Sequence, residues 1–185
     1  MNITPEIDKA IRVYAEMTEL PAMLVSAMVL TESGGDQWAW NPEPHYRYLV
    51  DATTGAPFRR LTADEIRSQV PPKDFPSMPG LADDRDAEWW GQQASWGLMQ
   101  VMGAVAREYG FKQHFPALCD VHTGLQYGCR HLGRLRDRFL ERHGWEGVVA
   151  AYNAGSPRRD SLGWVNQGYV DKVRAHGGFG FQESQ

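Results

Sequence analysis

Apolar residues recur at helical spacing through most of the chain, and the first such run follows Thr4 and Pro5. Ile7, Ile11 and Tyr14 are separated by four and then three residues. Proline fits the first turn of a helix, because the N–H that it lacks has no partner there. The pattern therefore predicts a first helix that begins at the proline.

The next segment, residues 21–32, is apolar nearly all round. A helix with apolar residues on every side is a buried helix. Gly34 and Gly35 follow it, and glycine readily adopts the positive φ that ends a helix. We expect a buried helix with Glu32 in its last turn.

Regular helices are predicted again in the second half of the chain, each followed closely by a glycine. Their expected ranges are 95–109, about 121–142, 145–153 and 164–175. Gly110, Gly144, Gly155 and Gly177 supply the stops. We expect the tail, residues 179–185, to be frayed.

Residues 36–94 interrupt this helical pattern and hold most of the prolines. Within them, residues 47–58 are typical of two short strands around a turn. Residues 62–65, Thr-Ala-Asp-Glu, form a capping box and predict a short helix. We therefore expect a mainly α fold of the α+β type. It is a single helical domain over residues 1–185, with 36–94 as a long insertion that carries a small β-hairpin.

Glu32 is the first candidate for chemistry. It is expected at the carbonyl end of a buried helix, where the helix dipole is negative. Burial and the dipole both disfavour the ionised carboxylate, so both raise its pKa. A carboxylic acid that stays protonated near neutral pH has the property that a general acid needs.

Three further polar side chains stand out. Gln100 is an amide among apolar residues, and Tyr152 and Asn153 end an alanine-rich helix. A buried amide needs hydrogen-bond partners, which the hydroxyl and acetamido groups of a sugar supply. The protein backbone is the commoner partner of a lone glutamine, and an aromatic in such a helix is usually core.

Taken together, these segments resemble a known family. Glu-Ser-Gly-Gly at 32–35, Gly-Leu-Met-Gln at 97–100 and Ala-Tyr-Asn-Ala-Gly at 151–155 occur in the order found in the soluble lytic transglycosylases. Tyr169-Val170 looks like the closing motif of this family. The resemblance implies a lysozyme-like fold of the SLT type and cleavage of the glycan strand of peptidoglycan, with no metal or cofactor.

The resemblance also implies roles for single residues. Glu32 is the sole catalytic acid and base, and core packing is the alternative role for Met102. Ser95 is the candidate for a serine that compact members carry in the short link after the catalytic glutamate. The residues expected to bind substrate are Ser33, Ser95, Gln100, Met102, Tyr152, Asn153 and Tyr169.

The chain departs from the family pattern at two places. Residues 36–94 make the link from Glu32 to Gln100 much longer than in the family. Members of the family usually have a proline shortly after Gly-Leu-Met-Gln, where this chain has Gly103. The long insertion, with an N-terminus that lacks the pattern of a secretory signal, resembles phage endolysins and tail-associated lysins.

The expected reaction cleaves the β-1,4 bond between N-acetylmuramic acid and N-acetylglucosamine and leaves a 1,6-anhydro end. Glu32 acts first as acid and then as base. A hydrolytic muramidase of the same fold is the nearest alternative, and it needs a second carboxylate to activate water. Asp36 and Asp51 are the candidates for it. A non-catalytic wall-binding or particle-structural protein is the alternative from another class.

Composition narrows the partners and the compartment. A net charge of −4 makes nucleic acid a poor partner, and no stretch is long enough to span a membrane. Cys119 and Cys129 allow a single disulfide, but two free thiols, as in a protein made in the cytoplasm, are the favoured interpretation. We expect a monomer without a signal peptide, which acts on the periplasmic cell wall after release by phage lysis machinery or is carried there on a particle.

Overall fold

The structure, a computed structural model, describes residues 3–68, 70–78, 80 and 84–182. It is 55% helical, with only small antiparallel sheets, which confirms the mainly α fold. The α-helices are α1 (Pro5–Met17), α2 (Ala22–Ser33), α3 (Ala63–Ser68), α4 (Arg85–Gln92), α5 (Gly103–Glu108), α6 (Val121–Ala154) and α7 (Gln167–Ala175). The strands are β1 (Trp40–Pro42), β2 (Ala94–Trp96), β3 (Val101–Met102), β4 (Arg159–Asp160) and β5 (Gly163–Trp164), and the 3-10 helices are η1 (Phe115–Cys119) and η2 (Gly180–Gln182).

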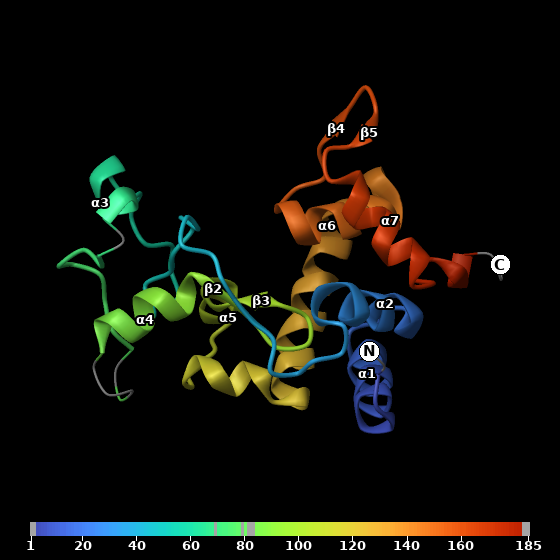
Figure 1. The fold of residues 1–185 in the computed structure, drawn as a ribbon, viewed down its shortest axis with the longest axis horizontal. Helices are drawn as coiled ribbons and strands as arrows, with labels where there is room; N and C mark the ends of the chain where they lie inside the picture. The colour runs from blue at the N-terminus through green and yellow to red at the C-terminus, as the bar shows by residue number, and fades with distance from the viewer. Residues whose placement is uncertain (1–2, 69, 79, 81–83, 183–185) are drawn as a thin grey trace.

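Helix α2 is part of a helical body with α1, α6 and α7. It packs against α1 and α7, and α6 in turn contacts both of those helices (Figure 1). Leu24, Val25 and Met28 of α2 are fully buried, as the apolar sequence predicts, but Met23 is 51% exposed, so the helix is not buried on every side. Gly34 ends the helix with a φ of 64°, so the predicted stop is also confirmed.

Helix α6 joins two helices that the sequence separates at Gly144. That glycine has a φ of 62° and a ψ of −177°, which kinks the run between its two halves. The sequence predicts that the last helix begins at residue 164, but it begins at Gln167. Trp164 lies instead in β5, where it pairs with Arg159 of β4. The β4–β5 hairpin projects from the helical body (Figure 1).

The predicted helix over residues 95–109 is wrong in its first half. Residues 94–102 form strands β2 and β3, and only α5 is helical. The turn between the strands contains two residues with positive φ, Gly97 at 70° and Gln100 at 47°. A helix cannot contain these angles. Strand β1 completes a three-stranded antiparallel sheet in the order β1-β2-β3.

The insertion lies on one side of this sheet and the helical body on the other (Figure 1). Its predicted hairpin over residues 47–58 is reduced to one bridge, between Val50 and Pro57. The predicted capping box is present, because Thr62 and Glu65 exchange side chain to backbone hydrogen bonds of 2.8 and 3.2 Å. A small core of its own holds the insertion together: Leu49, Leu61, Phe75 and Trp89.

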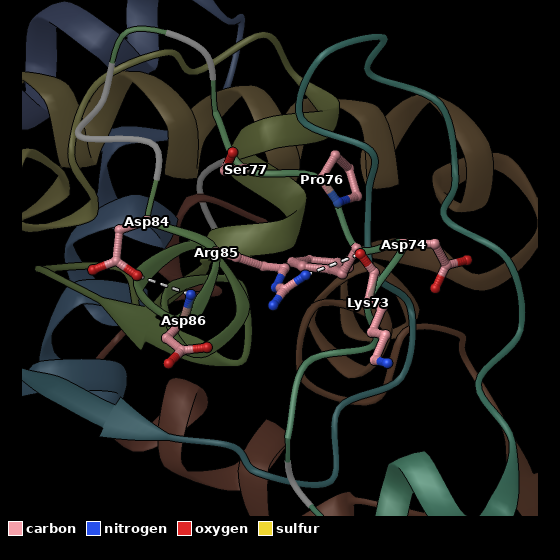
Figure 2. Close-up of a pocket in the computed structure, with 8 residues that line it drawn as sticks. Lys73, Asp74, Pro76, Ser77, Asp84, Arg85 and Asp86 are labelled. Carbon is pink, nitrogen blue, oxygen red and sulfur yellow. Dashed lines mark hydrogen bonds between the residues drawn. The ribbon is translucent and has the colours of Figure 1, made fainter.

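A surface pocket of about 770 Å³ opens at the outer end of the insertion, between residues 73–77 and 84–86 (Figure 2). Arg85 crosses it and donates a hydrogen bond of 2.9 Å to the carbonyl of Lys73. Asp84 caps the start of α4 through the N–H groups of Asp86 and Ala87. None of the residues predicted to bind substrate lines this pocket.

The tail is more ordered than we expected. Phe179 is 9% exposed, residues 180–182 form η2, and the ring of Phe181 packs edge-on against Trp145. The prediction of a frayed tail is therefore wrong for residues 179–182, because these aromatic rings find apolar contacts on the helical body. Residues 183–185 lie outside the described part of the chain.

Cys119 and Cys129 are buried and free, as predicted. Burial raises the pKa of the Cys129 thiol to about 12. Among the residues that the structure describes, no helix has the length and apolar character needed to cross a bilayer.

Candidate active site

Glu32 lies in the last turn of α2, two residues before Gly34. Its carboxyl group is crowded by protein atoms, and this burial raises its pKa from 4.5 to about 7. A hydrogen bond from the hydroxyl of Tyr169 acts in the opposite direction and lowers the pKa. Burial is the larger effect, so Glu32 is poised to give up and recover a proton near neutral pH.

Glu32 opens onto a cleft of about 570 Å³. Helices α2 and α6 supply one part of its lining, and the β-sheet with the first residues of the insertion supplies the rest. The residues that line it are Glu32, Asn41, Glu43, Tyr46, Ser95, Gln100, Met102, Tyr152 and Asn153. The structure thus brings five of the seven predicted substrate-binding residues to the cleft that holds Glu32.

Gln100 and Ser95 are joined within the cleft wall. The Ser95 hydroxyl donates a hydrogen bond of 2.9 Å to Oε1 of Gln100. Nε2 of Gln100 donates to the carbonyls of Ala39 and Gly97, at 3.1 and 2.9 Å. The backbone as well as a neighbouring hydroxyl therefore satisfies this amide. Its bonds hold the β2–β3 turn against the segment that leads into β1, despite the positive φ at Gln100, which costs about 1–3 kcal/mol.

Tyr152 and Asn153 approach the cleft from the end of α6. The Tyr152 hydroxyl donates 2.8 Å to the carbonyl of Met99, so it fixes the turn beside Gln100. Asn153 accepts a hydrogen bond of 2.9 Å from Asn166. Its own Nδ2 has no partner among the described residues, which leaves an amide donor at the exposed edge of the cleft.

Ser33 and Tyr169 do not line the cleft. The Ser33 hydroxyl donates 2.9 Å to the carbonyl of Leu98 and so ties the end of α2 to the β2–β3 turn. Tyr169 reaches Glu32 itself from α7. Ser33 therefore positions the end of α2, and Tyr169 positions the carboxyl group of Glu32.

Sequence reasoning missed Asn41 and Glu43, and it favoured a surface position for Tyr46 over a contact with glycan or stem peptide. They lie in the first part of the insertion, and β-pairing sets Asn41 directly opposite Ser95. Asn41 donates 2.6 Å to Oε1 of Glu43. The strand signal of β1 is only three residues long, so nothing in the sequence shows which residues 50 positions away it will face.

The two carboxylates that we had considered as partners of Glu32 are not in the cleft. Asp36 caps the N–H of Trp38 at 2.9 Å. Asp51 organises an exposed turn through Thr53, at 2.8 and 2.6 Å, and those hydrogen bonds lower its pKa. Glu43 is instead the second carboxylate that the cleft contains.

A comparison with known protein families matched residues 9–163 to the transglycosylase SLT domain. The chain belongs to this family. The match includes Glu32, the insertion, Gln100, Tyr152 and Asn153, and it ends before α7 and Tyr169. The chain matched no curated protein and no solved structure.

Membership assigns the chemistry at the family level. The SLT domain family comprises peptidoglycan lytic transglycosylases, so this chain is an enzyme of the lysozyme-like fold that acts on peptidoglycan. In the described part of this SLT domain, no three His, Cys, Asp or Glu side chains are grouped so that they could hold a metal ion. The titratable groups of the cleft are Glu32, Glu43, Tyr46 and Tyr152.

Proposed function

We propose that the enzyme cleaves the β-1,4 bond between N-acetylmuramic acid and N-acetylglucosamine and forms a 1,6-anhydro end on the muramic acid. The observation that carries the proposal is the state of Glu32. It is a partly buried carboxyl group with a pKa of about 7 that faces a cleft and is held by Tyr169. Ser95, Gln100, Met102, Tyr152 and Asn153 form the walls that position the glycan.

In the first step Glu32 is the acid. Its proton passes to the oxygen that links the two sugars, and the bond from that oxygen to C1 of the muramic acid breaks. The acetamido oxygen of the same sugar bonds to C1 as the glycosidic bond breaks, and so takes up the positive charge that develops there. This substrate assistance replaces the second carboxylate of most glycosidases.

In the second step the ionised Glu32 is the base. It takes the proton of the C6 hydroxyl, O6 bonds to C1, and the acetamido oxygen is released. The carboxyl group is protonated again, and no water is consumed. A pKa near 7 suits both steps, since neither the loss nor the recovery of the proton is strongly uphill.

The test is Glu32→Gln on purified cell walls, followed by clearing of turbidity and mass spectrometry of the fragments. Wild type should release fragments one water lighter than hydrolysis products, and Glu32→Gln should lose at least about 100-fold in rate. Glu16→Gln, on the exposed face of α1, is the matched control. Full activity of Glu32→Gln would end the proposal.

A second candidate function, hydrolysis, is favoured by one observation. Glu43 lines the same cleft as Glu32, and Asn41 orients one of its oxygens. A carboxylate across the cleft could activate a water in place of the C6 hydroxyl. Under this alternative Glu43→Gln lowers the share of reducing ends. Under transglycosylation the Glu43→Gln variant still releases anhydro fragments. Asp36→Asn is the control, and it should leave the products unchanged under both mechanisms.

We further propose that the enzyme works as a monomer on the periplasmic wall, in the manner of a phage endolysin or a particle-borne lysin. What supports a monomer is that one chain supplies Glu32 together with the described residues that line the cleft. Light scattering gives the mass in solution. Lysis only when the outer membrane is opened would support access through release or carriage, and lysis of intact cells would contradict it.

A further inference from the structure

A second groove lies in the insertion, with a volume of about 710 Å³. Apolar side chains make most of its lining, Phe58, Leu61 and Ile66 among them. Its charged residues are Arg47, Arg60 and Glu108. A groove of this composition suits a ligand that has small apolar groups and also carries charge.

The groove and the catalytic cleft share one segment of chain. Tyr46 lines the cleft, and the next two residues, Arg47 and Tyr48, line the groove. The rings of Tyr46 and Tyr48 meet edge to face with centroids 5.8 Å apart. The two sites therefore lie next to each other along residues 46–48.

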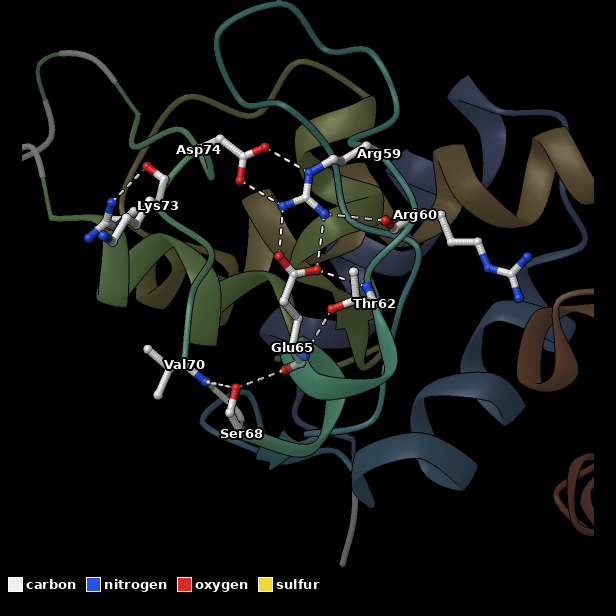
Figure 3. A network of polar contacts seen from close by, with 9 residues as sticks. Arg59, Arg60, Thr62, Glu65, Ser68, Val70, Lys73 and Asp74 are labelled. Carbon is white, nitrogen blue, oxygen red and sulfur yellow. Dashed lines mark hydrogen bonds and ion pairs between the residues drawn. The ribbon is translucent and has the colours of Figure 1, made fainter.

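Hydrogen bonds of neighbouring residues hold the segments that line the groove in place. Arg59 binds both oxygens of Asp74 at 2.7 Å and both oxygens of Glu65 at 2.7 and 3.0 Å (Figure 3). On the other side, the Gln92 side chain bonds to the N–H and the carbonyl of Val50, each at 2.8 Å. A ligand therefore meets walls that are already ordered, which reduces the entropy lost on binding.

The side chains of Arg47 and Arg60, the two arginines that line the groove, take no part in the Arg59 network. Figure 3 shows the Arg60 side chain directed away from the Arg59 network, and its guanidinium has no partner in the described part of the chain. Arg47 makes one long bond, 3.4 Å, to the carbonyl of His45. The carboxylate of Glu108 forms a long, exposed ion pair of 3.7 Å with Arg134. Two available cations and one carboxylate thus face a ligand of mixed charge.

We propose that this groove binds the stem peptide of peptidoglycan, so that the enzyme prefers glycan strands that carry peptides. The inference rests on the proposed function and names the substrate more closely. The peptide leaves the lactyl group of the muramic acid, the sugar that reacts in the cleft. Its alanine methyl groups suit the apolar lining, its carboxylates suit Arg47 and Arg60, and the amine of its diamino acid suits Glu108.

The length of the peptide fits this assignment. An extended chain spans about 3.4 Å per residue, so a tetrapeptide reaches about 13 Å. Consecutive residues line the two sites, Tyr46 the cleft and Arg47 the groove, so a peptide of this length suits the step from one site to the other. A further sugar is a poorer occupant, because its hydroxyl groups would lose water against apolar side chains without gaining partners.

Binding tests the proposal directly. The ligands are the disaccharide GlcNAc–MurNAc with and without its tetrapeptide, and neither contains the bond that the enzyme cleaves. Calorimetry with the wild-type chain should show that the peptide strengthens binding about tenfold at low salt. The gain should shrink as salt screens the exposed arginines. Equal affinity for the two ligands would overturn the proposal.

Variants locate the effect. Arg47→Gln combined with Arg60→Gln should weaken binding of the peptide-bearing ligand about fivefold and leave the bare disaccharide unchanged. Arg67→Gln is the matched control, since Arg67 lies on α3 of the same insertion, is 71% exposed and does not line the groove. An equal loss in the control, or no loss in the double variant, would contradict the assignment.

Cleavage separates this proposal from the one on which it rests. Wild type is given intact glycan strands and strands from which an amidase has removed the peptides. Cleavage of both at the same KM keeps the transglycosylase and removes the peptide site. Cleavage of neither removes the proposed function, and the calorimetry then still decides whether the groove binds the peptide.

Discussion

Tyr169 of α7 donates a hydrogen bond to the carboxylate of Glu32 at the end of α2. Burial of Glu32 favours the neutral acid and raises its pKa, while this bond favours the ionised form and lowers it. The two effects together leave the pKa at about 7. One residue can then serve as acid and as base within a single reaction.

Removal of this bond should shift the pH dependence of the enzyme. The reaction needs Glu32 protonated, so wild-type activity should fall as the pH rises above about 7. Tyr169→Phe removes a bond that stabilises the ionised form, so the pKa rises and the fall moves up by about one pH unit. Initial rates of wall clearing between pH 5 and pH 9 measure the shift.

Tyr127→Phe is the control for this shift. Tyr127 is partly buried, packs edge-on against Phe111 of the core and contributes a phenol that does not touch Glu32. Its pH profile should match that of wild type. A Tyr169→Phe profile that is unmoved, or that moves to lower pH, would mean that Tyr169 does not set the pKa of Glu32.

Glu32 should also cost stability at alkaline pH. Its pKa is 4.5 when exposed in the unfolded chain and about 7 when folded, so the folded state holds the proton more tightly. The free energy of unfolding therefore falls as the pH rises from about 4.5 to 7. The full penalty is present above the folded pKa and amounts to about 3 kcal/mol.

Glu32→Gln removes this penalty. The variant should unfold at a higher temperature than wild type at pH 8, and at nearly the same temperature at pH 4.5. Thermal unfolding followed by circular dichroism at the two pH values makes the comparison, with Glu16→Gln alongside. A variant no more stable than wild type at pH 8 would show that the carboxyl group is not desolvated as the structure indicates.

The sequence predicts the helical body well because its signals are local. The apolar run in residues 22–33 predicts a helix that is largely buried, which holds for Leu24, Val25 and Met28 although Met23 is 51% exposed, and Gly34 ends that helix with a positive φ. The same apolar run and the same glycine predict the position of Glu32 in the last turn of that helix. The three motifs around Glu32, Gln100 and Tyr152 then predict the family, which the match over residues 9–163 confirms.

The sheet and the second half of the cleft could not be predicted in this way. Strands β2 and β3 contain three and two residues, which is too short for any periodicity. Their shape depends on positive φ at Gly97 and Gln100 and on pairing with β1, across more than 50 positions of sequence. Glu43 and Tyr46 therefore reach the cleft through tertiary contacts that leave no trace in local pattern.

Gly97 should be among the least replaceable glycines of the chain. Its φ is +70°, and a Cβ there would lie 2.3 Å from the carbonyl oxygen of Leu118. Gly55 has a similar φ of +74° with nothing within 4 Å, so it is a matched control for strain alone. Gly55→Ala should cost about 1–2 kcal/mol of unfolding free energy.

Gly97→Ala should cost at least about 2 kcal/mol more than Gly55→Ala, because backbone must move as well. The Gln100 turn would move with it, so KM for cell-wall fragments should rise in any Gly97→Ala protein that folds. Denaturant unfolding and initial rates measure the two effects. Equal losses of stability at the two positions would show that the contact with Leu118 is not a constraint.

The buried ion pair between Glu88 and Arg107 should stabilise the packing of the insertion against α5. Their side chains are 3% and 1% exposed, and two bonds of 2.8 Å join them. Arg107 also donates to the carbonyls of Phe111 and Gln113, at 2.7 and 2.9 Å. The pair therefore links α4 of the insertion to α5 and to the loop that follows it.

Glu88→Gln leaves a buried guanidinium without its counter-ion and should cost about 3–5 kcal/mol of unfolding free energy. Asp8→Asn breaks an exposed pair with Arg12 and should cost less than about 0.5 kcal/mol. Replacing Glu88 and Arg107 together by methionine should recover much of the loss, since no unpaired charge remains. If the single and double variants are equally unstable, the cost comes from packing and not from charge, and guanidinium chloride unfolding of the four proteins distinguishes these outcomes.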